Sequence, residues 1–136
     1  MGNDRNMKFL AVEDETPVAT MMVSLLSRAG HEVKVSSTGD TGLELATAEK
    51  FDLITLDMDL PNITGFELCR EFKQRHISSH TPIVFVTGRA AEERRQRAFD
   101  LGAEDLIEKP FVVPDFISRI MACAKPKNEP TPGIKL

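Results

Sequence analysis

The sequence has few of the residue patterns that mark a zinc site or a disulfide framework. Only two cysteines occur among its 136 residues, and Cys69 and Cys123 lack the Cys-x-x-Cys spacing of zinc sites. The three histidines, His31, His76 and His80, show no ligand spacing either. The pattern therefore argues against structural zinc and against disulfides, and both cysteines are expected to pack as small apolar side chains.

Long apolar runs and an excess of positive charge are also missing. No apolar run is long enough to span a bilayer, and residues 1–6 lack the apolar stretch of a signal peptide. Lys and Arg number 17 against 21 Asp and Glu, so the net charge is −4. With this net negative charge, the sequence shows neither the excess of basic residues typical of nucleic-acid binding nor a polybasic membrane anchor. We therefore expect a cytoplasmic domain that binds neither nucleic acid directly nor a membrane.

Strand-like and helix-like segments alternate along most of the chain. Strands are expected at about residues 7–12, 31–35, 53–56, 83–87 and 105–109, and helices at about 17–29, 38–50, 65–77, 90–101 and 114–124. Thr16 is expected to be the N-cap of the first helix, Pro17 its first helical residue and Gly30 its C′ residue. One domain should therefore occupy residues 7–124, between a disordered N-terminus (1–6) and a Pro-rich tail or linker (125–136).

Strand–helix alternation at this spacing is typical of parallel βαβ units with right-handed crossovers. The uninterrupted apolar run at 53–56 suits a strand buried on both faces, whereas 31–35 alternates and is expected at a sheet edge. The sequence therefore predicts an α/β fold, a doubly wound five-stranded parallel sheet of (βα)5 type in three α/β/α layers.

Polar side chains follow four of the expected strands. Glu13 and Asp14 come after the first, Asp57 after the third, Thr87 after the fourth and Lys109 after the fifth. Because the carboxyl ends of parallel strands meet at one edge of an open α/β sheet, where ligands bind, these side chains are expected to converge.

Such a cluster requires a compensating charge. Two carboxylates about 4 Å apart repel by roughly 4 kcal/mol at an effective dielectric of about 20, and one lysine cannot offset several of them. Either their pKa values rise or a hard divalent cation binds. Oxygen ligands favour Mg²⁺, which keeps some of its water and usually coordinates a phosphate next. The cluster therefore favours phosphoryl transfer onto Asp57, assisted by Lys109 and the metal.

Taken in order, these motifs resemble the receiver domain of bacterial two-component response regulators, which has a flavodoxin-like fold. The resemblance runs from about Lys8 to Ala124. It is carried by the acidic pair, by Asp57 with Pro61 and Gly65 behind it, by Thr87, and by Lys109-Pro110-Phe111.

The resemblance implies that Asp57 accepts phosphate from the phosphohistidine of a histidine kinase or a phosphotransfer protein. Glu13, Asp14, Asp57 and the main-chain carbonyl of Asp59 would then hold Mg²⁺ or Mn²⁺. Such a domain is not an enzyme on other substrates and catalyses only its own phosphorylation and dephosphorylation.

The resemblance also assigns roles around the phosphate. Lys109 would contact the phosphoryl group, and its bond to Pro110 would be cis. Thr87 would turn toward the phosphate and shift the surface formed by the fourth helix, fifth strand and fifth helix. That surface would bind an output domain or a downstream partner protein, or a second copy of the chain in a homodimer.

Two positions depart from the commonest pattern of the family, and two more bear on its reactivity. The switch position on the fifth strand, usually Tyr or Phe, is Leu106. The first acid of the pair is Glu13, which lengthens one ligand arm. Asp59 and Arg89, each two residues beyond a motif residue, are expected to approach across the mouth of the site and to tune its reactivity.

Two other interpretations are open at this point. Asp57-Met58-Asp59 also resembles the DxD motif of haloacid-dehalogenase phosphatases, but there the nucleophile normally follows the first strand and the acidic metal pair comes after the lysine. A degenerate receiver that acts only as an interaction module would keep the fold without the chemistry. Stoichiometric labelling of Asp57 would separate both from a phosphoacceptor.

Overall fold

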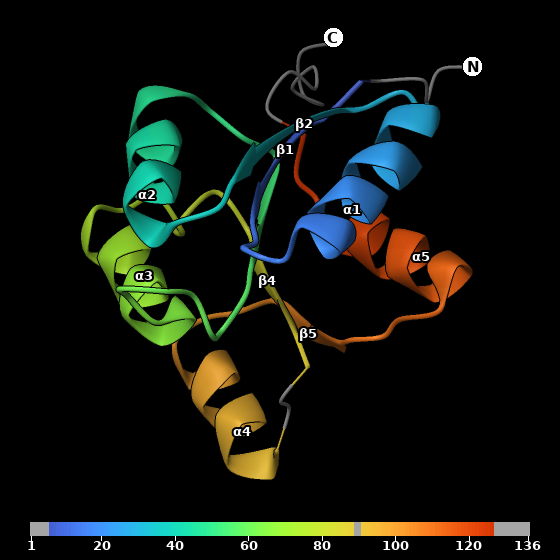
Figure 1. The fold of residues 1–136 in the computed structure, drawn as a ribbon. Helices are drawn as coiled ribbons and strands as arrows, with labels where there is room; N and C mark the ends of the chain where they lie inside the picture. The colour runs from blue at the N-terminus through green and yellow to red at the C-terminus, as the bar shows by residue number, and fades with distance from the viewer. Residues whose placement is uncertain (1–5, 89–90, 127–136) are drawn as a thin grey trace, which may run out of the picture.

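The computed structural model describes residues 6–88 and 91–126, and the expected tails at 1–6 and 125–136 lie almost wholly outside this part. The elements alternate as expected (Figure 1). In chain order they are β1 (Lys8–Val12), α1 (Thr16–Arg28), β2 (Glu32–Ser36), α2 (Gly39–Ala48), β3 (Leu53–Leu56), α3 (Gly65–Gln74), β4 (Ile83–Thr87), α4 (Glu92–Asp100), β5 (Asp105–Glu108) and α5 (Val113–Cys123).

The strands form one sheet in the order β2-β1-β3-β4-β5, and every neighbouring pair is parallel. Helices α1 and α5 cover one face, and α2, α3 and α4 cover the other (Figure 1). The predicted doubly wound, three-layer α/β/α fold is therefore confirmed. The prediction that the second strand lies at an edge is confirmed too.

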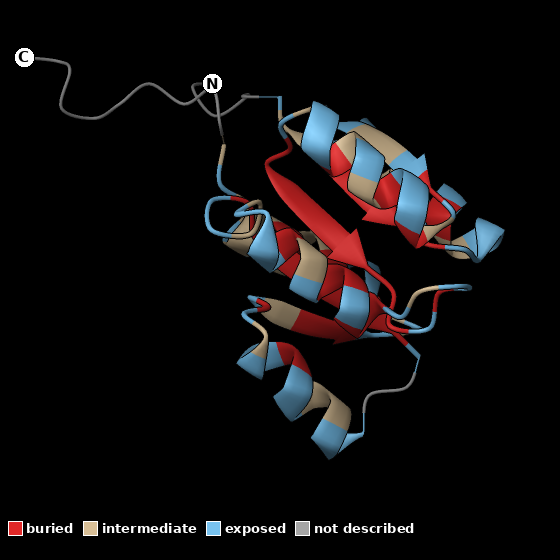
Figure 2. Ribbon diagram, turned by 90° about the vertical axis from the view of Figure 1, so that its left-hand side faces the viewer, coloured by how far each residue is buried: buried red, intermediate tan, exposed pale blue. Residues whose placement is uncertain are grey.

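Two apolar layers hold the helices to the sheet, as the buried strands between the helices in Figure 2 illustrate. Because successive strand residues point to opposite faces, Phe9 and Ala11 of β1 pack toward α1 and α5, while Leu10 and Val12 pack toward α2 and α3. Every residue of β3 and β4 is buried. The central strands are therefore rigidly held, and the ends of β3 and β4 present Asp57 and Thr87 from a fixed frame.

The start of α1 differs from the prediction by one residue. The N–H of Ala19 donates to the carbonyl of Glu15 at 3.0 Å, so Glu15 is the N-cap and Thr16 is already helical. Pro17 is therefore the second helical residue. At the other end, Gly30 adopts φ +95° beyond the last turn, which confirms it as the C′ residue.

The start of α4 also differs, because Ala91 is extended (φ −62°, ψ 158°) and the helix begins at Glu92 rather than near Ala90, which lies outside the described residues. None of the helices in the described ranges has the length and apolar character needed to cross a membrane.

Candidate functional site

Glu13 and Asp57 are fixed side by side at the ends of adjacent strands. The N–H of Glu13 donates to the carbonyl of Ser36 at 2.9 Å, and the N–H of Asp57 donates to the carbonyl of Val12 at 3.1 Å. These bonds continue the pairing of β1 with β2 and β3 for one residue beyond the strands. As a result Glu13 and Asp57 are buried, at 2% and 5% exposure, whereas Asp14 is exposed.

The loop between β3 and α3 folds back tightly on the end of β3. The N–H of Gly65 donates to the carbonyl of Met58 at 2.9 Å. A Cβ atom at Gly65 would collide with the carbonyl oxygen of Asp57 and would lie 2.8 Å from the Cα of Met58. Thr64 and Glu67 then form a capping box that starts α3. Glycine is therefore required at this position by the close approach of the backbone to Asp57.

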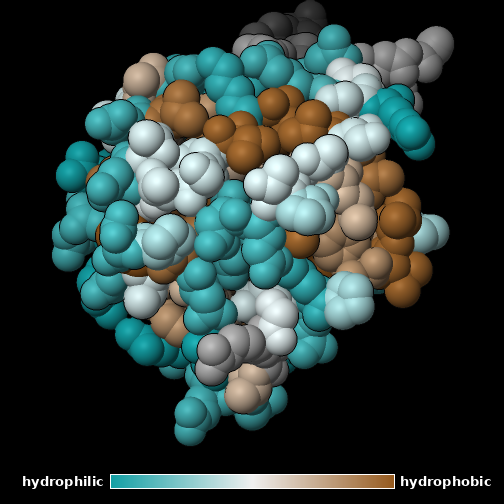
Figure 3. All heavy atoms as spheres, viewed as in Figure 1, coloured by the Kyte–Doolittle hydropathy of each residue, from teal (hydrophilic) through white to brown (hydrophobic). Residues whose placement is uncertain are grey.

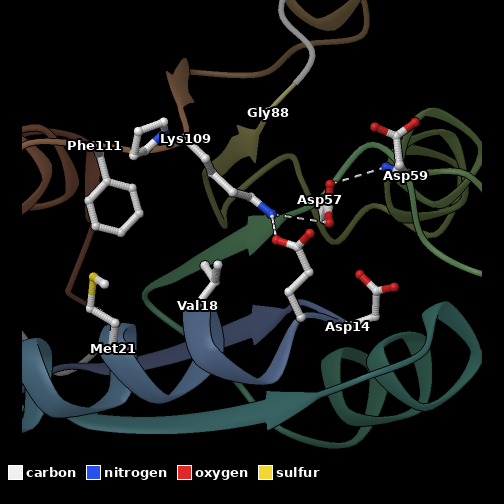
Figure 4. Close-up of a pocket in the computed structure, with 10 residues that line it drawn as sticks. Asp14, Val18, Met21, Asp57, Asp59, Gly88, Lys109 and Phe111 are labelled. Atoms are coloured by element: carbon white, nitrogen blue, oxygen red, sulfur yellow. Dashed lines mark hydrogen bonds and ion pairs between the residues drawn. The ribbon is translucent and has the colours of Figure 1, made fainter.

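Lys109 brings a positive charge to the two buried acids, and Figure 4 shows its ammonium beside Asp57. Its main-chain N–H donates to the carbonyl of Thr87 at 2.9 Å, and its bond to Pro110 is cis, as the family resemblance implied. Its Nζ lies 3.0 Å from Glu13 Oε2, 3.0 Å from Glu15 Oε1 and 3.4 Å from Asp57 Oδ2. The lysine thus joins three carboxylates from two other strand ends.

The charges of the site are strongly perturbed. Burial, together with the charge of Asp57, raises the pKa of Glu13 to about 7. Burial and the charge of Asp57 raise the pKa of Asp14 as well. Burial would lower the pKa of Lys109, but hydrogen bonds to Glu15 and Glu13 outweigh it and raise the value to about 12. The lysine is therefore charged at neutral pH, while Glu13 and Asp14 keep their protons to a higher pH than usual.

A bound divalent cation would stabilise the ionised form of these acids. One carboxylate oxygen from each of Glu13, Asp14 and Asp57 lies within 4.8 Å of the others. Glu13 Oε1 is buried and has no hydrogen-bond partner among the described residues. Hard oxygen ligands around an unsatisfied buried carboxylate fit Mg²⁺ or Mn²⁺ and do not fit zinc. These three residues could therefore hold the predicted cation.

Most of the predicted site residues lie around one cleft of about 500 Å³. Asp14, Asp57, Asp59 and Lys109 line it (Figure 4). Glu13 is not a lining residue, but it is bonded to Lys109. The main-chain N–H of Asp59 donates to Asp57 Oδ1 at 3.1 Å, which orients that carboxylate. The remaining lining residues are Glu15, Val18, Met21, Gly88, Pro110 and Phe111.

The other predicted residues lie elsewhere. Thr87 is completely buried at the end of β4 and does not line the cleft, although Gly88 beside it does. Leu106 is buried in the core on the side of α4, where it pairs in register with Phe85. Arg89 lies outside the described residues, so its predicted approach to Asp59 stays a prediction.

Two site residues were missed by sequence reasoning. The side chain of Glu15 reaches Lys109, and Arg94 of α4 donates to both carboxylate oxygens of Asp59 at 3.1 and 3.2 Å. A third acid next to the acidic pair was a visible signal for Glu15. No sequence signal distinguishes Arg94 from its neighbours Arg95 and Arg97, because only the packing of α4 selects it.

The sequence model of the response regulator receiver domain matches residues 9–121. Response regulator ArlR of Staphylococcus saprophyticus is 37% identical over 115 residues, which cover 85% of this chain and 51% of ArlR. The alkaline phosphatase synthesis transcriptional regulatory protein PhoP of Bacillus subtilis is 32% identical over 131 residues, covering 96% of this chain and 54% of PhoP. This chain thus spans about half the length of both curated relatives.

The fold also matches solved structures. The structure of chemotaxis protein CheY4 of Vibrio cholerae superposes with a TM-score of 0.82 at 29% identity, covering 87% of this chain and 98% of CheY4.

Proposed function

This chain belongs to the response regulator receiver domain family of two-component signalling, and on that premise we propose that Asp57 is its phosphoacceptor. One observation carries the assignment: among the acids at the edge of the sheet, Asp57 is the one that lines the cleft, bonds Lys109 and also belongs to the group of three carboxylates that could hold a cation. The phosphatase and the degenerate receiver are not favoured, since the family matches and the full set of acids and lysine is present.

The main chain and Lys109 hold the nucleophile ready. The N–H of Asp59 fixes Asp57 Oδ1, and the ammonium of Lys109 lies 3.4 Å from Oδ2. A rotated carboxylate would lose both contacts, so the attacking oxygen is oriented before a donor arrives. Lys109 then faces the charge that develops on the equatorial oxygens.

The proposed donor is a phosphohistidine on a histidine kinase or a phosphotransfer protein. A carboxylate oxygen of Asp57 attacks phosphorus in line as the P–N bond breaks. The imidazole leaves with the electron pair of that bond and is protonated, and the product is an aspartyl phosphate. Dephosphorylation is the attack of water on the same phosphorus, which returns the carboxylate and inorganic phosphate.

Glu13, Asp14 and Asp57 are proposed as carboxylate ligands of Mg²⁺ or Mn²⁺, with the main-chain carbonyl of Asp59 as a further ligand. When bound, the cation neutralises phosphoryl oxygens and the repulsion among the acids. The unpartnered Oε1 of Glu13 supports this assignment, because a buried carboxylate oxygen is costly without a compensating charge.

Thr87 and Leu106 occupy the two switch positions through which the phosphate is proposed to change the α4–β5–α5 surface. Thr87 is one residue from the cleft, at Gly88, and its carbonyl accepts the N–H of Lys109. Leu106 is too small to copy an aromatic switch residue, so we assign the shift to Thr87 and the main chain. An output domain, a partner protein or a second copy of the chain would bind that surface.

The donor is expected to dock beside the apolar wall of the cleft. Val18, Met21 and Phe111 line this wall, and Met21 is 45% exposed. In Figure 3 apolar residues gather on the side where Figure 1 places α1 and α5. An apolar surface next to a charged site suits a protein donor, since such a donor adds contact area that a small phosphate compound lacks.

Intact-mass spectrometry tests the proposal. Protein treated with acetyl phosphate and Mg²⁺ should gain one phosphoryl group, and Asp57→Asn should gain none. Chelating the Mg²⁺ with EDTA should abolish the gain of the phosphoryl group. Labelling of Asp57→Asn at the rate of the unmodified chain would overturn the assignment.

A further inference from the structure

All three N–H donors of the Lys109 ammonium are engaged by carboxylates, so none is available for a phosphoryl group. An ammonium carries three N–H donors, and three carboxylates surround this one: Glu13 at 3.0 Å, Glu15 at 3.0 Å and Asp57 at 3.4 Å. The nearest partners are therefore the two glutamates and not the proposed phosphoacceptor. For Lys109 to contact a phosphate on Asp57, at least one of these carboxylates must be released.

Glu15 is the carboxylate that can be released at low cost. Its side chain is 58% exposed, whereas those of Glu13 and Asp57 are 1% and 6% exposed. Released into solvent, the Glu15 carboxylate is fully hydrated. Glu13 would instead be left as a buried charge with fewer partners, which is far more costly. The N–H of Glu15 donates to Glu13 Oε2 through the main chain, and that contact survives the release.

A second observation, independent of the lysine contacts, concerns the start of α1. Glu15 occupies the N-cap, where a short polar side chain normally accepts a hydrogen bond from the first turn. The Glu15 side chain makes no capping bond and reaches Lys109 instead. The helix therefore forgoes a stabilising cap in favour of a contact in the phosphorylation site. Departures from a local structural preference, such as a missing N-cap, are expected where a side chain has a functional role.

We propose that Glu15 is a reactivity-determining residue that occupies Lys109 in the unphosphorylated domain and competes with the incoming phosphoryl group for it. It thereby slows phosphorylation by small anionic donors, which must displace Glu15 and approach its negative charge unaided. A protein donor is less affected, because docking contacts hold its phosphohistidine against the cleft. The inference rests on the proposed phosphorylation of Asp57.

Three variants of the full chain separate the effects of contact, charge and stability. Glu15→Gln removes the charge and keeps the shape. Glu15→Asp keeps the charge, but its arm is one methylene shorter and no longer reaches Lys109. Glu15→Ser removes the contact and can cap α1. Glu44→Gln, an exposed acid on α2, is the control for loss of charge far from the site.

The experiment measures the rate of labelling by acetyl phosphate with Mg²⁺, using intact-mass spectrometry. Exposed ion pairs typically shift equilibria by about two- to fivefold, so all three Glu15 variants should be labelled faster by that factor and Glu44→Gln should match the wild type. Glu15→Ser should also melt about 2–5 °C higher, since it gains a cap.

The possible outcomes are distinct. If the wild type is not labelled, the proposed function fails and the inference with it. If the wild type is labelled and the Glu15 variants react at its rate, only the inference is overturned. If Glu15→Gln and Glu15→Ser are faster but Glu15→Asp reacts at the wild-type rate, the charge of Glu15 acts through space and competition for Lys109 is overturned. A lower melting temperature for Glu15→Ser would contradict the uncapped start of α1.

Discussion

At the scale of single residues, Glu13 couples the stability of the domain to pH and to metal. The pKa of its carboxyl is about 7 in the folded state against 4.5 ordinarily, so the folded state binds the proton more tightly than the unfolded state. Without metal, the free energy of unfolding should therefore fall, by up to about 3 kcal/mol, as the pH rises from 4.5 to 7. Asp14 shifts in the same direction.

Urea unfolding followed by circular dichroism at pH 5 and pH 7.5 measures this dependence. With EDTA the protein should be less stable at the higher pH. Mg²⁺ should stabilise it more at pH 7.5 than at pH 5, because bound metal requires ionised acids. Glu13→Gln should flatten the pH dependence, and an unchanged slope in that variant would refute the role given to Glu13.

Arg94 gives the second prediction at this scale. It holds Asp59 at the mouth of the cleft and lies 5.7 Å from the centre of the Phe66 ring, so it bridges α4 and the loop after β3. Arg94→Ala should free Asp59, open the mouth to water and shorten the lifetime of the aspartyl phosphate by about two- to fivefold. Arg89→Ala tests the original expectation for Arg89 in the same assay.

The lifetime is measured as loss of the phosphorylated mass after removal of the donor. Arg95→Ala on the same helix is the matched control and should leave the lifetime unchanged. An equal lifetime in Arg94→Ala and the wild type would show that the pair with Asp59 does not govern access to the phosphate.

At the scale of elements, the turn from β3 to α3 is under the tightest constraint. Gly65→Ala would drive a Cβ into the backbone of Asp57 and Met58, so we expect a loss of about 1–3 kcal/mol of stability together with slower phosphorylation. Gly88→Ala is the control for stability, since nothing lies within 4 Å of a Cβ there. Equal unfolding free energies for the two variants would contradict the close approach at Gly65.

The end of α3 offers a change in the opposite direction. His76 follows the C-cap with φ +61°, a conformation that costs most residues about 1–2 kcal/mol and glycine almost nothing. His76→Gly should therefore raise the free energy of unfolding by about 0.5–1 kcal/mol after the extra entropy of the unfolded glycine chain. Lys73→Gly, inside the same helix, should lower it, and a loss in both variants would contradict the left-handed conformation at His76.

At the scale of the whole molecule, the features that follow from the order and direction of the strands could be predicted from the sequence. Parallel strands end at one edge, so Glu13, Asp14, Asp57 and Lys109 could be placed together from their positions after strands. The contact of Glu15 with Lys109 could not, because it depends on the length of one side chain and on a cap that is not made. The pairing of Asp59 with Arg94 depends on how α4 packs against the rest of the domain, and the hydrophobic pattern of the sequence does not determine that packing.

The central claim, that Asp57 takes the phosphoryl group, is tested most directly by trapping the modified residue. Borohydride reduces an aspartyl phosphate to homoserine, which peptide sequencing by mass spectrometry locates in the chain. After treatment with acetyl phosphate and Mg²⁺, homoserine should be found at position 57. Homoserine at Asp14 or Asp59, or at no position in protein that carries the phosphoryl group, would contradict the account.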